Sequence, residues 1–98
     1  MAETIDEITA EWTDEEGKLV VKELRKEILT RGQWTTIMFM IQELDKRSGE
    51  YGSPKVRIDR YQKRSGSFSR HSKFTISSKD QAMKVVKVLL EWFSDETT

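Results

Sequence analysis

The sequence predicts an α+β protein in which a four-stranded antiparallel sheet, a meander, is followed by a C-terminal amphipathic helix packed on one face. Three observations favour this class. Two segments alternate between apolar and polar residues, a third is apolar and β-branched, and the last long segment is apolar at helical spacing. The length of 98 residues suits one domain with a single modest core.

The N-terminal segment is acidic: residues 1–17 hold seven Asp and Glu and no Lys or Arg. A block of like charge with few apolar residues is typical of a disordered arm. We therefore expect an arm (1–17), a folded domain (18–94) and a short acidic tail (95–98). We also hypothesise that the arm folds back loosely over the basic face of the domain and competes with its ligand. The alternative is a passive, solubilising tail.

Three segments are expected to be strands. Residues 34–44 give the clearest one, because they are rich in β-branched and aromatic residues. Residues 55–63 and 71–77 alternate between apolar and polar positions and are separated by a Gly-containing turn. Residues 18–32 are ambiguous, because their apolar positions fit one side of a helix and also one face of a strand.

Residues 78–93 are predicted to form a helix. Ser78 and Gln81 make a capping box at its start. Its apolar positions cover an arc of about 220° at 100° per residue, which is wider than one sheet needs. We expect the excess to contact a second copy of the chain, although the arm or the first strand is an alternative cover. The residues expected at this dimer interface are Val88, Leu89 and Trp92.

Positive charge is concentrated in one part of the chain. All 17 Lys and Arg fall within residues 18–90, and seven lie between Lys55 and Lys73 with one acid, Asp59. We expect the helix to cover the apolar face of the sheet, which leaves the basic side chains on the opposite, open face. The residues expected to face the helix are Ile37, Phe39, Ile41, Val56, Ile58, Phe74 and Ile76.

An open face that mixes cations with aromatic and soft apolar side chains is typical of proteins that bind single-stranded nucleic acid. Cations follow the phosphates, and flat or polarizable side chains accept unstacked bases. Duplex-binding proteins more often present a helix to the major groove, and the predicted helix is too apolar for that role. DNA or RNA preference stays open. The predicted contact residues are Trp34, Met38, Lys55, Arg57, Tyr61, Lys63, Arg64, Arg70, His71 and Lys73.

Two other classes of function were weighed. A protein-interaction module could bind an acidic partner on the same face, since Met-rich surfaces adapt to varied partners. An enzyme is not expected, because the only histidine, His71, has no carboxylate beside it in sequence and no metal or phosphate-loop motif occurs. We expect no cofactor, no metal, no small-molecule substrate and no membrane partner. The absence of cysteine suits a cytoplasmic location, including association with the nucleoid.

The stretch VRIDRYQKRSGSFSRHSKFTISSKDQ (56–81) resembles the core signature of the positive-cofactor-four type of transcriptional coactivators and their small bacterial relatives. In this family a V-x-I-R-x-[YFW] strand leads through a Gly turn to a basic K-x-I-S strand and a capped helix. Asp59 stands where the family has Arg, so the role of that Arg would fall to Arg57 or Arg60. Phe74-Thr75 stands where the family has Lys-Gly. The matching residues are Val56, Ile58, Tyr61, Gly66, Lys73, Ile76, Ser77 and the helix 78–93.

This resemblance implies a fold and a function. It implies a four-stranded antiparallel sheet with one helix, so residues 19–30 would be a strand. It also implies a dimer joined largely through the helices, and single-stranded DNA bound across the sheet. A role in transcription regulation or DNA maintenance would follow.

Overall fold

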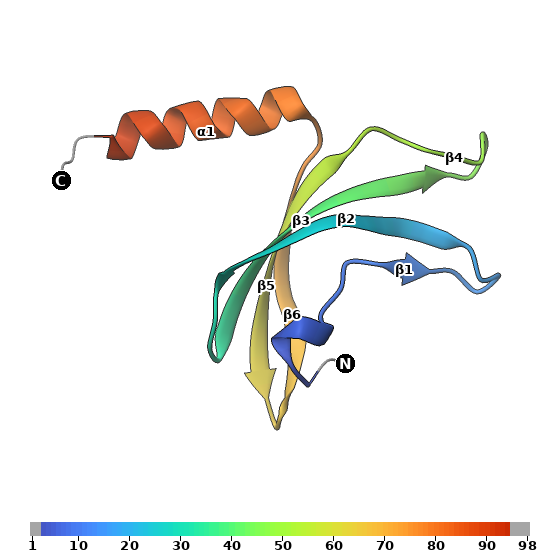
Figure 1. Cartoon of the computed structure of the whole chain (residues 1–98), viewed down its shortest axis with the longest axis horizontal. Helices are drawn as coiled ribbons and strands as arrows, with labels where there is room; N and C mark the ends of the chain where they lie inside the picture. The colour runs from blue at the N-terminus through green and yellow to red at the C-terminus, as the bar shows by residue number, and fades with distance from the viewer. Residues whose placement is uncertain (1–2, 95–98) are drawn as a thin grey trace.

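The computed structural model describes residues 3–94, so the predicted tail 95–98 lies outside the described residues. It confirms the α+β class, with a curled antiparallel sheet and one C-terminal helix (Figure 1). The four expected strands are the long ones, and two short strands add to them. In chain order the elements are η1 (Ile5–Glu7), β1 (Trp12–Thr13), β2 (Leu19–Thr30), β3 (Trp34–Asp45), β4 (Glu50–Tyr51), β5 (Lys55–Arg64), β6 (Ser67–Ile76) and α1 (Lys79–Phe93).

The sheet follows the order β1-β2-β3-β5-β6, and β4 pairs with the end of β3 ahead of β5. Every neighbouring pair is antiparallel. The ambiguous segment 18–32 is therefore mostly strand. Its pairing with β3 shifts between Glu23 and Arg25 and again between Ile28 and Thr30. Each shift breaks the period-two alternation, which is why periodicity alone did not identify this strand.

The pairing of β3 with β5 corrects the predicted division of the two faces. Phe39 lies opposite Arg57, and Met38 lies opposite Ile58. Apolar residues of β3 that were expected to share a face with Ile58 thus share one with charged residues of β5. A shift of one residue moves every side chain to the other face. We call the face bearing Phe39 and Arg57 the arm face, and the face bearing Met38 and Ile58 the open face.

The N-terminal arm (residues 3–17) packs on the arm face, where a disordered segment was expected. Ile8 and Ala10 are buried, and they join a core cluster with three residues of β3 that are almost fully buried. β1 then continues the arm as a strand beside β2. The arm is thus part of the hydrophobic core. The three β3 residues are Ile37, Phe39 and Ile41.

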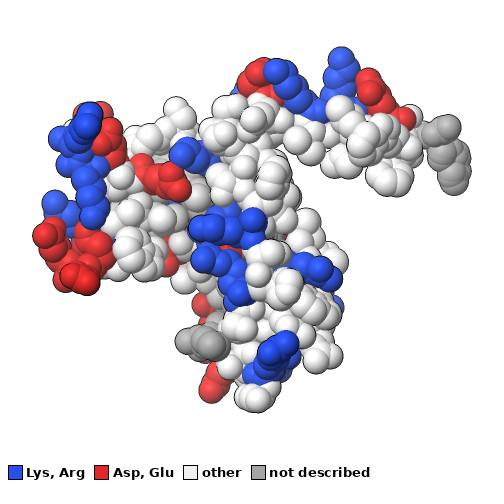
Figure 2. Space-filling view, turned by 180° about the vertical axis from the view of Figure 1, so that it is seen from behind, with Lys and Arg blue, Asp and Glu red and all other residues white. Residues whose placement is uncertain are grey.

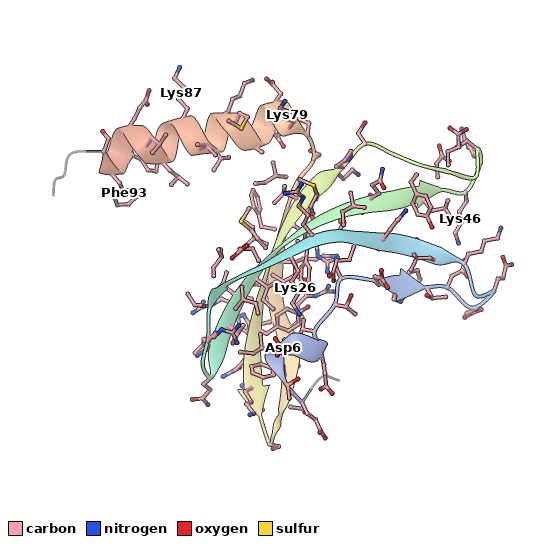
Figure 3. All side chains as sticks on the ribbon, viewed as in Figure 1. Asp6, Lys26, Lys46, Lys79, Lys87 and Phe93 are labelled. Carbon is pink, nitrogen blue, oxygen red and sulfur yellow. The ribbon has the colours of Figure 1, made fainter. Side chains whose placement is uncertain are left out.

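Two side chains of β2 hold the backbone of the arm. The Lys26 ammonium donates to the carbonyl oxygens of Ile5, Asp6 and Ile8 at 3.0, 3.2 and 2.7 Å. Glu23 Oε1 accepts from Thr9 Oγ1 at 2.7 Å and from a backbone N–H of the arm at 3.1 Å. In Figure 3, Lys26 lies between the sheet and η1, which carries Asp6. These contacts order a segment whose composition alone predicts disorder.

The helix does not pack on the sheet, in contrast to the prediction. α1 leaves the end of β6 and projects away from the strands (Figure 1). Ser78 caps it by accepting from the N–H of Gln81 at 3.1 Å, which is one half of the predicted capping box. The Gln81 side chain accepts from the N–H of Ser77 instead of that of Ser78. In Figure 3, Lys87 points away from the sheet, whereas Phe93 is on the other side of the helix. The exposed apolar residues are Met83, Val85, Val86, Val88, Leu89, Leu90, Trp92 and Phe93.

The arm explains why one face of the sheet has no room for the helix. Ile8 and Ala10 already cover the apolar residues of the arm face. On the open face, Val56 and Ile58 are only half-buried, and Phe74 is 61 % exposed rather than packed beneath a helix. Among the described residues, both apolar surfaces, that of α1 and that of the open face, are therefore without a cover. Within residues 3–94 no helix is long and apolar enough to cross a membrane.

Candidate nucleic-acid interface

The structure divides the predicted contact residues among three places. Register places one set on the arm face, a second set on the open face, and the remainder at the tip of the β5–β6 hairpin. The single basic face that was expected is therefore not formed. The arm-face set is Lys55, Arg57, Tyr61, Arg70 and Lys73; the open-face set is Trp34, Met38 and His71; the tip holds Lys63 and Arg64.

Asp59 is the centre of a buried polar cluster on the arm face. Its carboxylate is fully buried and accepts from Arg57 Nε at 2.9 Å and from Arg57 Nη2 at 2.8 Å. The Tyr61 hydroxyl donates to the same carboxylate at 3.2 Å. Arg57 and Tyr61 are themselves buried, whereas both were expected on an open surface. The arm covers this part of the sheet as part of the core, whereas the sequence suggested at most a loose contact.

The environment of Tyr61 keeps its hydroxyl protonated. Burial raises the pKa of Tyr61 to about 12, and the negative charge of Asp59 acts in the same direction. A phenol removed from water resists ionisation because its charged form loses hydration. Tyr61 therefore remains a hydrogen-bond donor to Asp59 at neutral pH.

The Arg57–Asp59 pair determines the charge of the whole β5–β6 hairpin. Asp59 is the only acid between Lys55 and Ile76, and its charge is compensated inside the protein. Lys55 is paired with Glu43 at 2.7 Å. The exposed charge of the hairpin is consequently all positive. In Figure 2, which views the molecule from behind Figure 1, Lys and Arg appear at the centre of the visible face and toward its lower end. The exposed hairpin cations are Arg60, Lys63, Arg64, Arg70 and Lys73.

The carboxylates of the arm do not neutralise these cations. Glu7 Oε1 accepts from the backbone N–H groups of Glu3 and Thr4, and these hydrogen bonds lower the pKa of Glu7. Asp14 accepts from the N–H of Lys18, which lowers its pKa in the same way. Within residues 3–94 no ion pair joins an arm carboxylate to a hairpin cation. The arm is thus held by its backbone and its apolar residues, not by ion pairs with the hairpin.

An aromatic and cationic cluster lies on the open face at the far end of the sheet from the helix. The Arg60 guanidinium carbon is 4.4 Å from the centre of the Trp34 ring. The His71 ring meets Trp34 edge-on, with centroids 5.0 Å apart and an interplanar angle of 85°. Trp34 remains 37 % exposed. We call Trp34, Arg60 and His71 the Trp34 cluster.

Local strand geometry builds the Trp34 cluster. The β5–β6 pairing shifts between Arg60 and Tyr61, so that His71 is an extra residue in β6. A bulge of this kind redirects a side chain, and here the imidazole contacts Trp34 across β5. Arg60 was not among the predicted contact residues. Its contact with Trp34 depends on the β3–β5 register, in which Arg60 lies opposite Thr36, and the sequence gives no direct signal for that register.

Within residues 3–94 no group of three or more His, Asp or Glu side chains could hold a metal ion. The imidazole of His71 contacts an indole, and Asp59 is occupied by Arg57 and Tyr61. Comparisons with family models, curated proteins and solved structures found no match to this chain.

Proposed function

We propose that the protein binds single-stranded nucleic acid, with the Trp34 cluster as the base-stacking platform and the exposed cations at the hairpin tip, Lys63 and Arg64, as the phosphate contacts. The observation that carries the proposal is a partly exposed indole with a guanidinium over its ring, beside a hairpin whose exposed charge is all positive. Unstacked bases bind such rings without strong sequence preference, while cations along the strand compensate the phosphates. The resemblance of residues 56–81 to single-strand-binding coactivators supports the same function, in transcription or DNA maintenance.

We also propose that the functional unit is a homodimer. Within residues 3–94, the apolar residues of α1 and those of the open face are not covered by another element. In Figure 1, α1 and the sheet border an open space below the helix. A second copy related by a two-fold axis can cover both at once, because such an interface uses the same surfaces twice. The Trp34 cluster lies at the end of the sheet away from α1, so it stays accessible in this arrangement.

Fluorescence anisotropy with labelled single-stranded DNA, single-stranded RNA and duplex DNA tests the binding function. We expect single strands to bind more tightly than the duplex. The slope of log affinity against log salt should be about −0.7 per phosphate neutralised. Trp34→Ala should weaken binding by about 1–3 kcal/mol, which is the usual contribution of one stacked base. Arg60→Gln should also weaken binding.

The matched control is Lys87→Gln, which removes one positive charge from the side of α1 that points away from the sheet. It should leave binding close to that of the parent. Equal losses of affinity in Arg60→Gln and Lys87→Gln would show that only the net charge of the protein matters, and would contradict a defined site. Affinity that does not change with salt would also contradict the proposal. Tight binding of a poly-glutamate peptide, with no binding of single strands, would support the alternative function of recognising an acidic protein partner.

A further inference from the structure

A second basic site lies on the arm face, on the other side of the sheet from the Trp34 cluster. It is a pocket of about 410 Å³ between the arm, the sheet and the edge strand β6. This volume falls in the range of small-molecule sites, about 300–1,000 Å³. Its lining comprises Thr9, Ala10, Glu11 and Trp12 of the arm, Val21 of β2, Arg57 of β5, and Arg70 and Lys73 of β6.

Positive charge in this pocket is only partly compensated. Asp59, buried beneath it, forms its close ion pair with Arg57 at 2.8 Å. Arg70 reaches the same carboxylate only at 3.9 Å, which leaves its other N–H groups free to donate. Lys73 lies opposite Asp59 in the β5–β6 ladder, and its side-chain ammonium makes no hydrogen bond or ion pair within residues 3–94. Glu11 is the single carboxylate in the lining.

The arm places an indole in the lining of the same pocket. Trp12 is 57 % exposed, although it belongs to β1 and its backbone is fixed opposite Val21. The exposed indole of Trp12 can stack on a flat ring, while the unpaired N–H groups of Arg70 and Lys73 can bind an anion beside it. Nucleotides combine these two features, a base with a π face and a phosphate group.

We propose that this pocket binds a single nucleotide carrying a terminal phosphate. Arg70 and Lys73 bind the phosphate, and the base stacks on Trp12. The Glu11 carboxylate accepts a hydrogen bond from a sugar hydroxyl or a base amino group. The ligand is either a free nucleoside monophosphate or the phosphorylated end of a strand. The site uses residues of the arm face, so it goes beyond the proposed function and does not depend on the Trp34 cluster.

Isothermal titration calorimetry of the full chain can test the site with five probes. They are a nucleoside 5′-monophosphate, the matching nucleoside, inorganic phosphate, and a short single strand with and without a 5′-phosphate. We expect the monophosphate to bind at least tenfold more tightly than the nucleoside or inorganic phosphate. A preference of at least tenfold for the phosphorylated strand identifies strand ends as the source, whereas equal binding of the two strands identifies the free nucleotide.

Matched variants separate the pocket from general charge effects. Arg70→Gln with Lys73→Gln should weaken nucleotide binding at least tenfold. Lys63→Gln with Arg64→Gln removes the same charge from the hairpin tip, outside the pocket lining, and should change it less than threefold. Trp12→Ala should also weaken nucleotide binding. Because the Trp12 side chain is exposed, the substitution should not unfold the protein, and a loss of binding would then report on the pocket.

Several outcomes would overturn this proposal. They are no binding of the monophosphate to the parent protein, equal binding of inorganic phosphate, or equal losses in the two double variants. Trp34→Ala distinguishes this site from the proposed function. It should weaken binding of the strand that lacks a phosphate and leave binding of the free monophosphate unchanged. Loss of monophosphate binding in Trp34→Ala would assign the nucleotide to the open face and contradict the pocket.

Discussion

Asp59 is a single residue with consequences for the whole hairpin. Its carboxylate is 0 % exposed and is compensated by Arg57. Removing one partner of a buried pair leaves the other charge without compensation, which costs about 3–5 kcal/mol. We expect Asp59→Asn to lower the free energy of unfolding by this amount in urea titrations. Replacing Asp59 and Arg57 together by Leu should restore much of the loss, and equal stability of Asp59→Asn and the parent would contradict the pair's structural role.

Tyr61 gives the protein a pH dependence in the alkaline range. Its pKa is raised from 10.0 to about 12 in the folded protein, mainly by burial. The folded state then holds a proton that the unfolded state releases, so the stabilisation is complete below pH 10 and is lost as pH rises toward 12. The loss can reach about 2.7 kcal/mol at 1.36 kcal/mol per pKa unit.

Because lysines also titrate in this range, the measurement is a comparison of urea unfolding between the parent and Tyr61→Phe from pH 9 to pH 12. The parent should lose more stability across this interval than the variant. Parallel profiles would show that Tyr61 does not couple folding to pH.

Among the elements, the arm was the one whose place in the hydrophobic core was not predicted from the sequence. Seven acids in residues 1–17 dominate its composition, and composition predicts disorder. The acids stay near the surface, while the few apolar residues between them enter the core. Composition averages over both kinds of residue, so it could not detect a segment in which two apolar side chains, Ile8 and Ala10, fix the position.

A test of the arm follows from Ile8. Ile8→Ala removes a buried side chain from the core cluster and should lower the free energy of unfolding by about 2–4 kcal/mol. Glu11→Ala, an exposed position on the same arm, should change it by less than about 0.5 kcal/mol. Urea titration provides both values. An unchanged midpoint for Ile8→Ala would show that the arm is not part of the cooperative unit.

The other elements show which signals in the sequence were reliable. The strand at 34–44 and the helix at 78–93 were predicted within a few residues, because β-branched content and capping are local properties. The relation between strands was not predicted. β3 is apolar on both faces, so its alternation is compatible with either register against β5, and the register chosen from the sequence was wrong by one residue.

The wrong register between β3 and β5 also led to errors in the predicted site. Local sequence predicted that cations gather in the β5–β6 hairpin, and the structure confirms this. It also named Trp34 and His71, which do come together. Arg60 was named only as one of two substitutes for the family's Arg and was left out of the contact residues, and Arg57 was placed on the wrong kind of surface. Both assignments depend on pairing between strands. The contact of Trp34 with Arg60 is a tertiary property that no spacing in the chain encodes.

At the scale of the whole molecule, the state of α1 argues for assembly. The helix has 15 residues, and all of them are exposed to solvent except Ala82, which is half-buried. Isolated helices shorter than about 12–15 residues are marginal in water, and most helical stability in proteins comes from packing an apolar face. A helix with this exposed apolar stripe therefore needs a cover, and the proposed homodimer supplies it from the open face of the second copy.

Leu89→Glu tests this arrangement, because it places a charge within the exposed apolar stripe of α1. Sedimentation velocity at micromolar concentration should show a dimer for the parent and a monomer for the variant. Lys84→Glu changes a residue on the polar edge of the same helix and should leave the dimer intact. Circular dichroism adds a second readout, since a helix that loses its cover should lose helical signal on dilution of the parent or in Leu89→Glu. A monomeric parent that retains full helical signal would contradict both the dimer and the reason given for it.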